Sequence, residues 1–224
     1  MSGKIFSNYF KEIFISAILF VVLFSCSSVK LNEQKKVFVN TFSAEEMQLI
    51  KSSDTLSPMR VYKITSNSDY LLLRTKSSYI KPDAQNLLLQ TFVKRLYRTV
   101  TDSLSLGVGI AAPQVGILKN IIWVQRFDKE NFQFEVYLNP TIIQYSLKKQ
   151  TYREGCLSIP NRSDIVKDRA YAILIEYDMI NGAHKTEMVE GFTAVIFQHE
   201  IDHLNGILYL DHLKKEIMDA QKSN

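Results

Sequence analysis

The spacing of apolar positions predicts the first helix and the strands of this chain. Between Asp83 and Thr101 apolar residues recur at steps of three and four, the period of a helix with one buried face. Short β-branched and aromatic runs, which are typical of strands, follow at 121–125, 132–138, 141–145 and 172–177. Asn181-Gly182 predicts a hairpin turn from the last of these to a strand at 185–189.

A second helix is predicted at residues 192–204. Phe192, Val195, Ile196 and His199 fall on one helical stripe, and Asn205-Gly206 provides a stop signal. A helix, several strands and then a helix predict an α+β fold, in which the helices are segregated from a mostly antiparallel sheet.

The first 26 residues have the layout of a signal peptide. Lys4 and Lys11 precede residues 13–24, which are apolar except for Ser16. Such a helix is about 18 Å long at ~1.5 Å per residue, too short for a hydrocarbon core of ~30 Å. Leu23-Phe24-Ser25-Cys26 resembles the bacterial lipobox, whose cysteine becomes the lipidated N-terminus. We therefore expect a signal peptide at 1–25; an uncleaved anchor and a cleaved signal without lipid are the alternatives.

The composition is that of an ordinary globular chain. The 224 residues are 46% apolar and 22% charged, with a net charge of +4. There is no dense basic cluster of the kind that a nucleic-acid groove requires, so we expect no nucleic-acid partner.

Residues 26–57 are polar and predict a tether, although 44–50 also suit a short helix, and residues 58–224 are expected to form the folded domain. The pattern fixes no oligomeric state.

The strongest chemical signal is the segment Gln-His-Glu-Ile-Asp-His-Leu at 198–204. Residues four apart on a helix differ by about 40° and one turn, so the imidazoles of His199 and His203 point the same way and can share a metal ion. Glu200 lies about 100° from His199, where it can reach a water on the metal without being a ligand. Two surface histidines and a solvated glutamate would give the same pattern.

A catalytic metal site usually has a third protein ligand, and two segments offer one. One class of metalloproteases continues the motif as H-E-x-x-H-x-x-G-x-x-H; here Gly206 matches, but Tyr209 stands at the ligand position. Upstream, the segment Glu-Gly-Cys-Leu-Ser at 154–158 offers the thiolate of Cys156, although a lone cysteine is most often a small buried apolar residue.

Residues 107–116, Gly-Val-Gly-Ile-Ala-Ala-Pro-Gln-Val-Gly, form a glycine-rich segment. A dinucleotide-binding loop would need a helix after it, and Pro113 breaks such a helix. Small residues with one amide side chain, that of Gln114, instead suit a wall that a substrate backbone approaches closely. An ordinary tight loop is the alternative.

Together the three segments resemble, in order, the three signature motifs of the peptide deformylase family. The resemblance runs from about Tyr70 to Leu213 and includes Asn139-Pro140 and the run 205–211. It implies mostly antiparallel sheets around a central metal-binding helix, with the amphipathic helix before it. It also implies a hydrolase that removes the formyl group from N-terminal formyl-methionine of peptides or proteins and releases formate. Asn161 stands where many members have glycine, so the loop beside the site is expected to differ.

The resemblance assigns a role to each motif residue. One divalent ion, iron(II) in most members with zinc, nickel or cobalt as substitutes, would be bound by Cys156, His199 and His203. Glu200 would act as general base and then return the proton to the departing amine. The Gln114 amide and the Leu157 backbone N–H would stabilise negative charge on the formyl oxygen.

Further residues are expected to bind the substrate or to support the metal ligands. A strand-addition mode would pair the substrate backbone with Gly107, Val108 and Gly109. Val195 and Ile196 share a helix face with His199 and suit an apolar slot for a methionine side chain, or else pack the core. Asp202 is expected to face away from the ion and to pair with Arg169.

The leader predicts an exported protein, anchored outside the cytoplasm of a bacterial cell through lipidated Cys26. Deformylases normally act in the cytosol or in organelles, and a cytoplasmic location follows here if the leader is not functional. Outside the cytoplasm, zinc or nickel is favoured because a thiolate–iron site is exposed to oxidation. Two other functions stay open: a zinc endopeptidase, and a non-catalytic lipoprotein that binds peptides on the same scaffold.

Overall fold

The computed structural model describes residues 41–222. The predicted signal peptide, Cys26 and the tether up to residue 40 lie outside the described residues. The elements are α1 (Ala44–Lys51), α2 (Asn67–Leu73), α3 (Leu87–Val100), β1 (Gly109–Ala111), β2 (Ile121–Gln125), β3 (Phe134–Tyr145), β4 (Lys149–Cys156), β5 (Ile159–Ala170), β6 (Ala172–Asp178), β7 (His184–Glu190), α4 (Gly191–Leu204) and α5 (Tyr209–Lys222), with short 3-10 turns η1 (Ala112–Val115) and η2 (Glu130–Phe132). Within this part of the chain, no helix is long and apolar enough to cross a bilayer.

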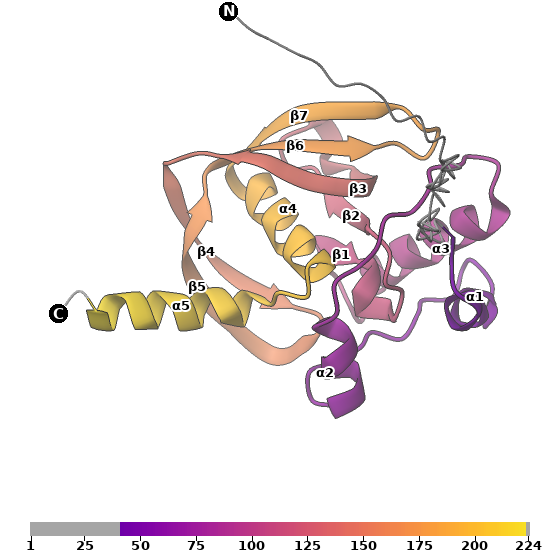
Figure 1. Cartoon of the computed structure of the whole chain (residues 1–224), viewed down its shortest axis with the longest axis horizontal. Helices are drawn as coiled ribbons and strands as arrows, with labels where there is room; N and C mark the ends of the chain where they lie inside the picture. The colour runs from indigo at the N-terminus through magenta and orange to yellow at the C-terminus, as the bar shows by residue number, and fades with distance from the viewer. Residues whose placement is uncertain (1–40, 223–224) are drawn as a thin grey trace, which may run out of the picture. The chain divides into compact units, whose positions relative to one another are not determined.

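Five strands form one antiparallel sheet in the order β1-β2-β3-β6-β7, and β4 and β5 pair as a separate antiparallel hairpin. Figure 1 shows α4 running between the sheet and the hairpin, with α1 and α3 gathered beyond β1. The predicted α+β fold around a central helix is therefore confirmed.

Helix α4 is buried on nearly all sides. Its apolar residues Ala194, Phe197 and Ile201 belong to the core that also contains Tyr137 and Ile175 of the sheet. The hairpin covers the opposite side, where the Gln198 side chain bonds both the N–H and the C=O of Ala170, at 2.9 and 3.0 Å. A helix buried this completely brings its polar residues into the interior, where each needs a partner.

Helix α3 confirms the amphipathic helix predicted from spacing. The Asn86 side chain caps it by accepting from the N–H groups of Leu88 and Leu89. Leu89, Phe92 and Leu96 are completely buried in a second core cluster.

The predicted tether is too long at its C-terminal end. Phe42 and Ile50 are buried in the same cluster as α3, and α1 carries a complete capping box between Ser43 and Glu46. Glu46 also accepts from the backbone N–H of Leu118, and Arg95 donates to the carbonyls at the end of α1. The folded domain therefore begins by residue 42 instead of 58, because apolar residues of this segment pack on the core and polar contacts tie it to the rest of the domain.

The runs at 132–138 and 141–145 belong to one strand, β3, instead of two. Asn139 has a φ of +51°, which asparagine tolerates, and the pairing of β3 with β6 shifts register between Leu138 and Thr141. The Asn139 side chain bonds the N–H and C=O of Ile80 and the Asp178 carboxylate, which holds this bulge in place.

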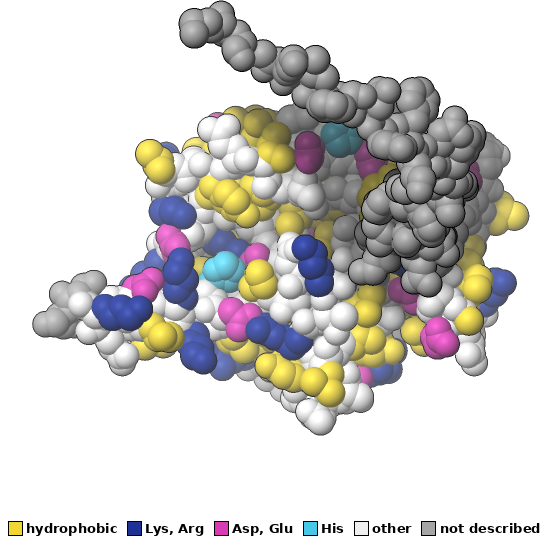
Figure 2. Space-filling view, viewed as in Figure 1, with side chains coloured by type: hydrophobic (Ala, Val, Ile, Leu, Met, Phe, Trp, Pro, Cys, Tyr) yellow, Lys and Arg dark blue, Asp and Glu magenta, His cyan; other side chains and the backbone are white. Residues whose placement is uncertain are grey.

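The β4–β5 hairpin, α2 and α5 are elements that the hydrophobic pattern did not predict. Helix α5 packs on β5, and Glu216 accepts from the backbone N–H groups of Lys167 and Asp168. Figure 2 shows side chains of both charges over the α5 end of the molecule, with apolar side chains between them.

One buried arginine joins three strands of the sheet. Arg126, 1% exposed, donates to Asp128 at 2.6 Å, to Glu187 at 2.7 Å and to the Tyr137 hydroxyl at 2.6 Å, and it lies 3.3 Å from Glu135. Its guanidinium is the main cause of a lowered pKa at Asp128, and it lowers the pKa of Glu187 against the opposing effect of partial burial.

Replacing Arg126 by methionine is expected to lower the free energy of unfolding by about 2–3 kcal/mol at pH 7, because partly buried carboxylates lose their cation. The lowered carboxyl pKa values stabilise the fold above the ordinary carboxyl pKa of about 4, and this contribution is lost as the pH falls below it. Urea unfolding from pH 7 to pH 3 should therefore show the difference between wild type and Arg126→Met shrinking. The exposed Lys185→Met is the control; an equal loss there, or a constant difference with pH, contradicts the assignment.

Candidate metal centre

Three predicted ligands converge between α4 and the end of β4. The ligand atoms of Cys156, His199 and His203 all lie within 4.8 Å of one another. The Cys156 Sγ is 3.2 Å from the His203 Nε2, and the two imidazole rings are 5.0 Å apart. The two histidines meet because α4 places them one turn apart, and the thiol meets them because the hairpin folds over that face of the helix.

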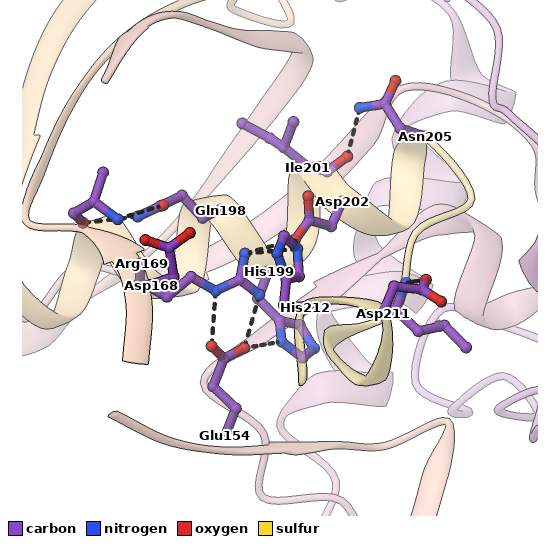
Figure 3. Close-up of polar contacts among 12 residues, drawn as sticks. Glu154, Asp168, Arg169, Gln198, His199, Ile201, Asp202, Asn205, Asp211 and His212 are labelled. Carbon is purple, nitrogen blue, oxygen red and sulfur yellow. Dashed lines mark hydrogen bonds and ion pairs between the residues drawn. The ribbon is translucent and has the colours of Figure 1, made fainter. Parts of the chain in front are cut away.

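A chain of charged contacts orients the first histidine. Figure 3 shows Glu154 reaching toward the Arg169 guanidinium, which donates to both of its oxygens at 2.7 and 2.9 Å. Glu154 also accepts from His199 Nδ1 at 2.8 Å, so the Nε2 of that ring is left for a metal. On its other side Arg169 donates to Asp202 at 2.6 Å, and Asp202 contacts His212 at 2.8 Å. The predicted pairing of Asp202 with Arg169 is thus present.

The two imidazoles favour the thiolate form of Cys156. Burial alone would raise the pKa of Cys156, but the neighbouring His203 and His199 imidazoles outweigh it and hold the pKa well below the usual range. Within residues 41–222, Cys156 is a free cysteine. A thiolate is the form of cysteine that binds metal.

Glu200 points into the same centre from the next position of α4. Burial raises the pKa of its carboxyl group to about 7, although the two imidazoles act in the opposite direction. Its close neighbour is Gly109 of β1, where an added Cβ would lie 2.5 Å from Glu200 Oε1 and 2.8 Å from Ile196. Gly109 is therefore required at this position for Glu200 to pack, a reason that the glycine-rich pattern alone did not suggest.

Gln114 is fixed over the thiol by the 3-10 turn η1. Its Oε1 accepts from the Ala111 N–H at 2.9 Å, and its Nε2 lies 3.6 Å from Cys156 Sγ and 3.3 Å from Ser158 Oγ. Pro113 starts this turn and Gly116, at φ +84°, ends it, so the segment is a short wall and not the start of a long helix. Leu157 follows Cys156 in the turn between β4 and β5 and lines the same pocket.

A pocket of about 500 Å³ opens onto this centre. It is lined by residues 104–109, by the β4–β5 turn and by one side of α4, where Val195 and Ile196 contribute apolar side chains. Gly107, Val108 and Gly109 form its edge, since β1 is the outermost strand of the sheet. Asn161 has a φ of +58°, so this loop keeps a glycine-like backbone with asparagine in it.

The donor set fits a divalent transition metal. One thiolate and two imidazoles are ligands that zinc, iron, nickel and cobalt accept, and three protein ligands leave a position open. Among the described residues, the buried atoms Glu200 Oε2 and His203 Nδ1 have no hydrogen-bond partner. Buried polar atoms of this kind are normally satisfied, which indicates that solvent and ligand belong to this centre.

Three residues that lie at this centre were not predicted from the sequence to belong to it. Glu154 lies two residues before Cys156, and a carboxylate near a metal-binding histidine is the signal that identifies it. Tyr209, at the position where a protease would have its third histidine, stacks on the His199 ring at 6.1 Å and donates its hydroxyl to Asp164. His212, three residues beyond that position, contacts Asp202.

Comparison with known proteins gives a family model and relatives that agree in their description. A family model described as Polypeptide deformylase matches residues 61–218. Peptide deformylase of Leptospira biflexa is 32% identical over 163 residues, covering 70% of this chain and 89% of that protein. Peptide deformylase 1 of Clostridium perfringens is 38% identical over 156 residues, covering 69% and 99%. The Met-Ala-Ser-bound crystal structure of a class I type b peptide deformylase from Acinetobacter baumannii has a TM-score of 0.61 at 31% identity, covering 69% of this chain and 98% of that one.

The substitution Arg169→Met is expected to cost about 3–5 kcal/mol of stability, because it leaves Glu154 buried without its cation and Asp202 without its main donor. Affinity for zinc or cobalt should also fall about 10- to 100-fold, since His199 loses its fixed partner. Urea unfolding and metal titration measure the two effects. Lys167→Met, two positions away and exposed, is the matched control, and equal behaviour of the two variants contradicts the network's role.

Proposed function

This chain belongs to the polypeptide deformylase family, and we propose that this metal-dependent peptide deformylase acts outside the cytoplasm on formyl-methionyl peptides or proteins. Hydrolysis of the N-formyl group would release formate and a free N-terminal amine. The convergence of Cys156 with His199 and His203, with Glu200 facing the same pocket, is the observation that supports it.

Cys156, His199 and His203 would hold the ion. When bound, a divalent ion supplies a Lewis acid that lowers the pKa of water and polarises a carbonyl group. The thiolate and imidazole ligands suit iron(II), the ion expected from the family, and they suit zinc or nickel equally well. We propose zinc or nickel for the exported protein, because these ions withstand oxidising surroundings better than a thiolate–iron site.

Glu200 would take a proton from the attacking water and return it to the departing amine. Its Oε2 has no hydrogen-bond partner among residues 41–222, and its raised pKa suits both taking and giving a proton near neutral pH. Gly109 and Ile196 hold the carboxylate from behind, so the role depends on the absence of a side chain at 109.

Two donors would stabilise the negative charge that grows on the formyl oxygen. The Gln114 amide is aimed at the Cys156 thiolate and is locked by the Ala111 N–H, which prevents it from turning away. The Leu157 backbone N–H would be the second donor, on the opposite wall. Fixed donors are effective because they need no reorganisation as the charge develops, and removing one typically costs about 3 kcal/mol of barrier.

The substrate backbone would add to the free edge of β1. Val108 accepts from the Gln125 N–H at 2.8 Å, and antiparallel ladders alternate, so the N–H and C=O of Gly109 face away from β2. Val195 and Ile196 lie beside this edge and would receive the methionine side chain. The peptide-bound Acinetobacter structure is consistent with a peptide occupying such a pocket.

Export and lipid anchoring rest on the sequence of the leader. Lys4 and Lys11, the apolar run 13–24 and the lipobox-like Leu-Phe-Ser-Cys ending at Cys26 support removal of 1–25 and acylation of Cys26. The protein would then stay at the outer side of a bacterial membrane and meet formylated peptides there.

Tyr209 argues against the endopeptidase alternative. The ring stacks on His199 and the hydroxyl is bonded to Asp164 at 2.9 Å, so the position that carries a ligand in that protease pattern is used for packing. A non-catalytic peptide-binding protein remains the alternative that the assay below distinguishes.

The full-length chain, purified in detergent and loaded with nickel or iron without oxygen, is expected to release formate from formyl-Met-Ala-Ser and leave the peptide chain intact. Glu200→Ala should retain the metal and lose about 10²–10⁴-fold in kcat, the usual contribution of a general base. Gly109→Ala should lower kcat as well, since it displaces Glu200. Formate is measured enzymatically and metal by elemental analysis.

Cleavage inside the peptide would instead indicate an endopeptidase, and tight binding without products would indicate the non-catalytic alternative. Loss of metal from Glu200→Ala would mean that the base assignment is wrong.

Expression in a bacterial host tests the leader. We expect the protein in the membrane fraction, with an N-terminal peptide that begins at acylated Cys26 by mass spectrometry, and Cys26→Ala should not be acylated. The same membrane preparation should contain zinc or nickel. An intact leader on a soluble protein would contradict export, and iron as the only metal would contradict the proposed metal preference.

A further inference from the structure

The exposed ionisable groups that line the pocket are all cationic. They are Lys63, Arg153 and Arg162, which we call the pocket rim. We propose that the rim selects formylated peptides that carry a carboxylate on the residues after the formyl-methionine. This inference rests on the proposed function and adds to it a class of substrate.

The carboxylates that line the pocket do not neutralise the rim. Glu154 and Glu200 are both buried, and Glu154 is paired with Arg169 and His199. Their charges are therefore used at the metal centre and do not face the opening.

Lys63 is fixed at the opening by its two neighbours. The Tyr62 N–H donates to the Gln114 carbonyl at 2.7 Å, and the Ile64 N–H donates to the Ser158 carbonyl at 3.0 Å. The backbone of Lys63 thus bridges the two walls that hold the metal centre. In residues 41–222 its ammonium group has no hydrogen bond or ion pair, so it is available to a substrate.

Arg153 lies on β4 and points to the face opposite the buried Glu154. Gly155, two residues on, shares that face and lines the pocket, and nothing approaches closer than 3.8 Å where a Cβ would stand. A substrate backbone can therefore pass over Gly155 with a side chain beside Arg153. The Arg153 guanidinium makes no ion pair or hydrogen bond within the described part of the chain.

Asp164 of β5 is the acidic partner of one rim residue, Arg162. Asp164 is bound by Arg162 at 2.7 Å and by the Tyr209 hydroxyl at 2.9 Å, and Arg153 contributes weakly to lowering its pKa. Asp164 therefore pairs with Arg162 and interacts only weakly with Arg153, and neither Lys63 nor Arg153 has an ion pair among the described residues. An apolar slot at the metal centre and two cations without ion pairs at the opening match a peptide that begins with methionine and has an acidic residue further along.

The wild-type chain tests this with three C-terminally amidated peptides, formyl-Met-Ala-Glu, formyl-Met-Ala-Gln and formyl-Met-Ala-Lys. We expect kcat/KM for the Glu peptide to exceed that for the Lys peptide about three- to tenfold, the size expected of solvent-exposed ion pairs. The preference should nearly vanish at 1 M salt, where charges are screened beyond about 3 Å. Formyl-Met-Ala-Gln with a free C-terminal carboxylate separates recognition of a chain end from recognition of a side chain.

Charge reversal provides the second test. Arg153→Glu and Lys63→Glu should each reduce or invert the ratio of Glu to Lys peptide. Lys185→Glu, an exposed lysine on β7 that does not line the pocket, changes the net charge equally and should keep the wild-type ratio.

Formate from all three amidated peptides at equal rates would overturn the inference and leave the proposed function intact. The inference would also be overturned if Lys185→Glu changed the ratio of Glu to Lys peptide as much as Arg153→Glu does. The net charge of the protein, and not the rim, would then cause the preference. Absence of formate from every peptide would overturn the proposed function and this inference together.

Discussion

The buried network of Arg169 and Glu154 with His199 and Asp202 sets the position of the β4–β5 hairpin on α4. An unpaired charge in this interior would cost several kcal/mol, so the two side chains must meet. Their meeting brings Glu154 against His199 and Arg169 against Asp202, which ties the hairpin to two residues of the helix. Cys156 follows Glu154 by two residues, and the same constraint therefore carries the thiol to the imidazoles.

The elements with regular apolar spacing could be predicted from the sequence, and they include the helix that supplies most of the site. Strand β2 appears where the strand period places it, α3 starts at Leu87, four residues after the predicted start at Asp83, and α4 starts one residue before its predicted start. Helical geometry alone also brings His199 and His203 together. The choice of Cys156 as their partner needed the resemblance to a family, because spacing left its role open.

The parts that were missed depend on contacts between distant polar residues. In the hairpin, Glu154 looks solvent-facing in the sequence and is buried only because it pairs with Arg169 and His199. The segment before residue 58 looks polar overall, yet Phe42 and Ile50 are buried in the same core cluster as α3. The need for glycine at position 109 was missed for a similar reason, because it comes from the side chain of Glu200, 91 positions away.

If the proposed lipid anchor is present, the docking of Phe42 would limit the distance between the catalytic pocket and the membrane. If Cys26 carries the lipid, the chain between Cys26 and Phe42 spans at most about 58 Å when fully extended, at ~3.6 Å for each step. A longer flexible spacer would let the enzyme sample the surrounding fluid. With a lipid at Cys26, a spacer of this length would restrict the enzyme to formylated ends presented within a few tens of ångströms of the lipid headgroups, such as the emerging ends of other membrane-attached chains.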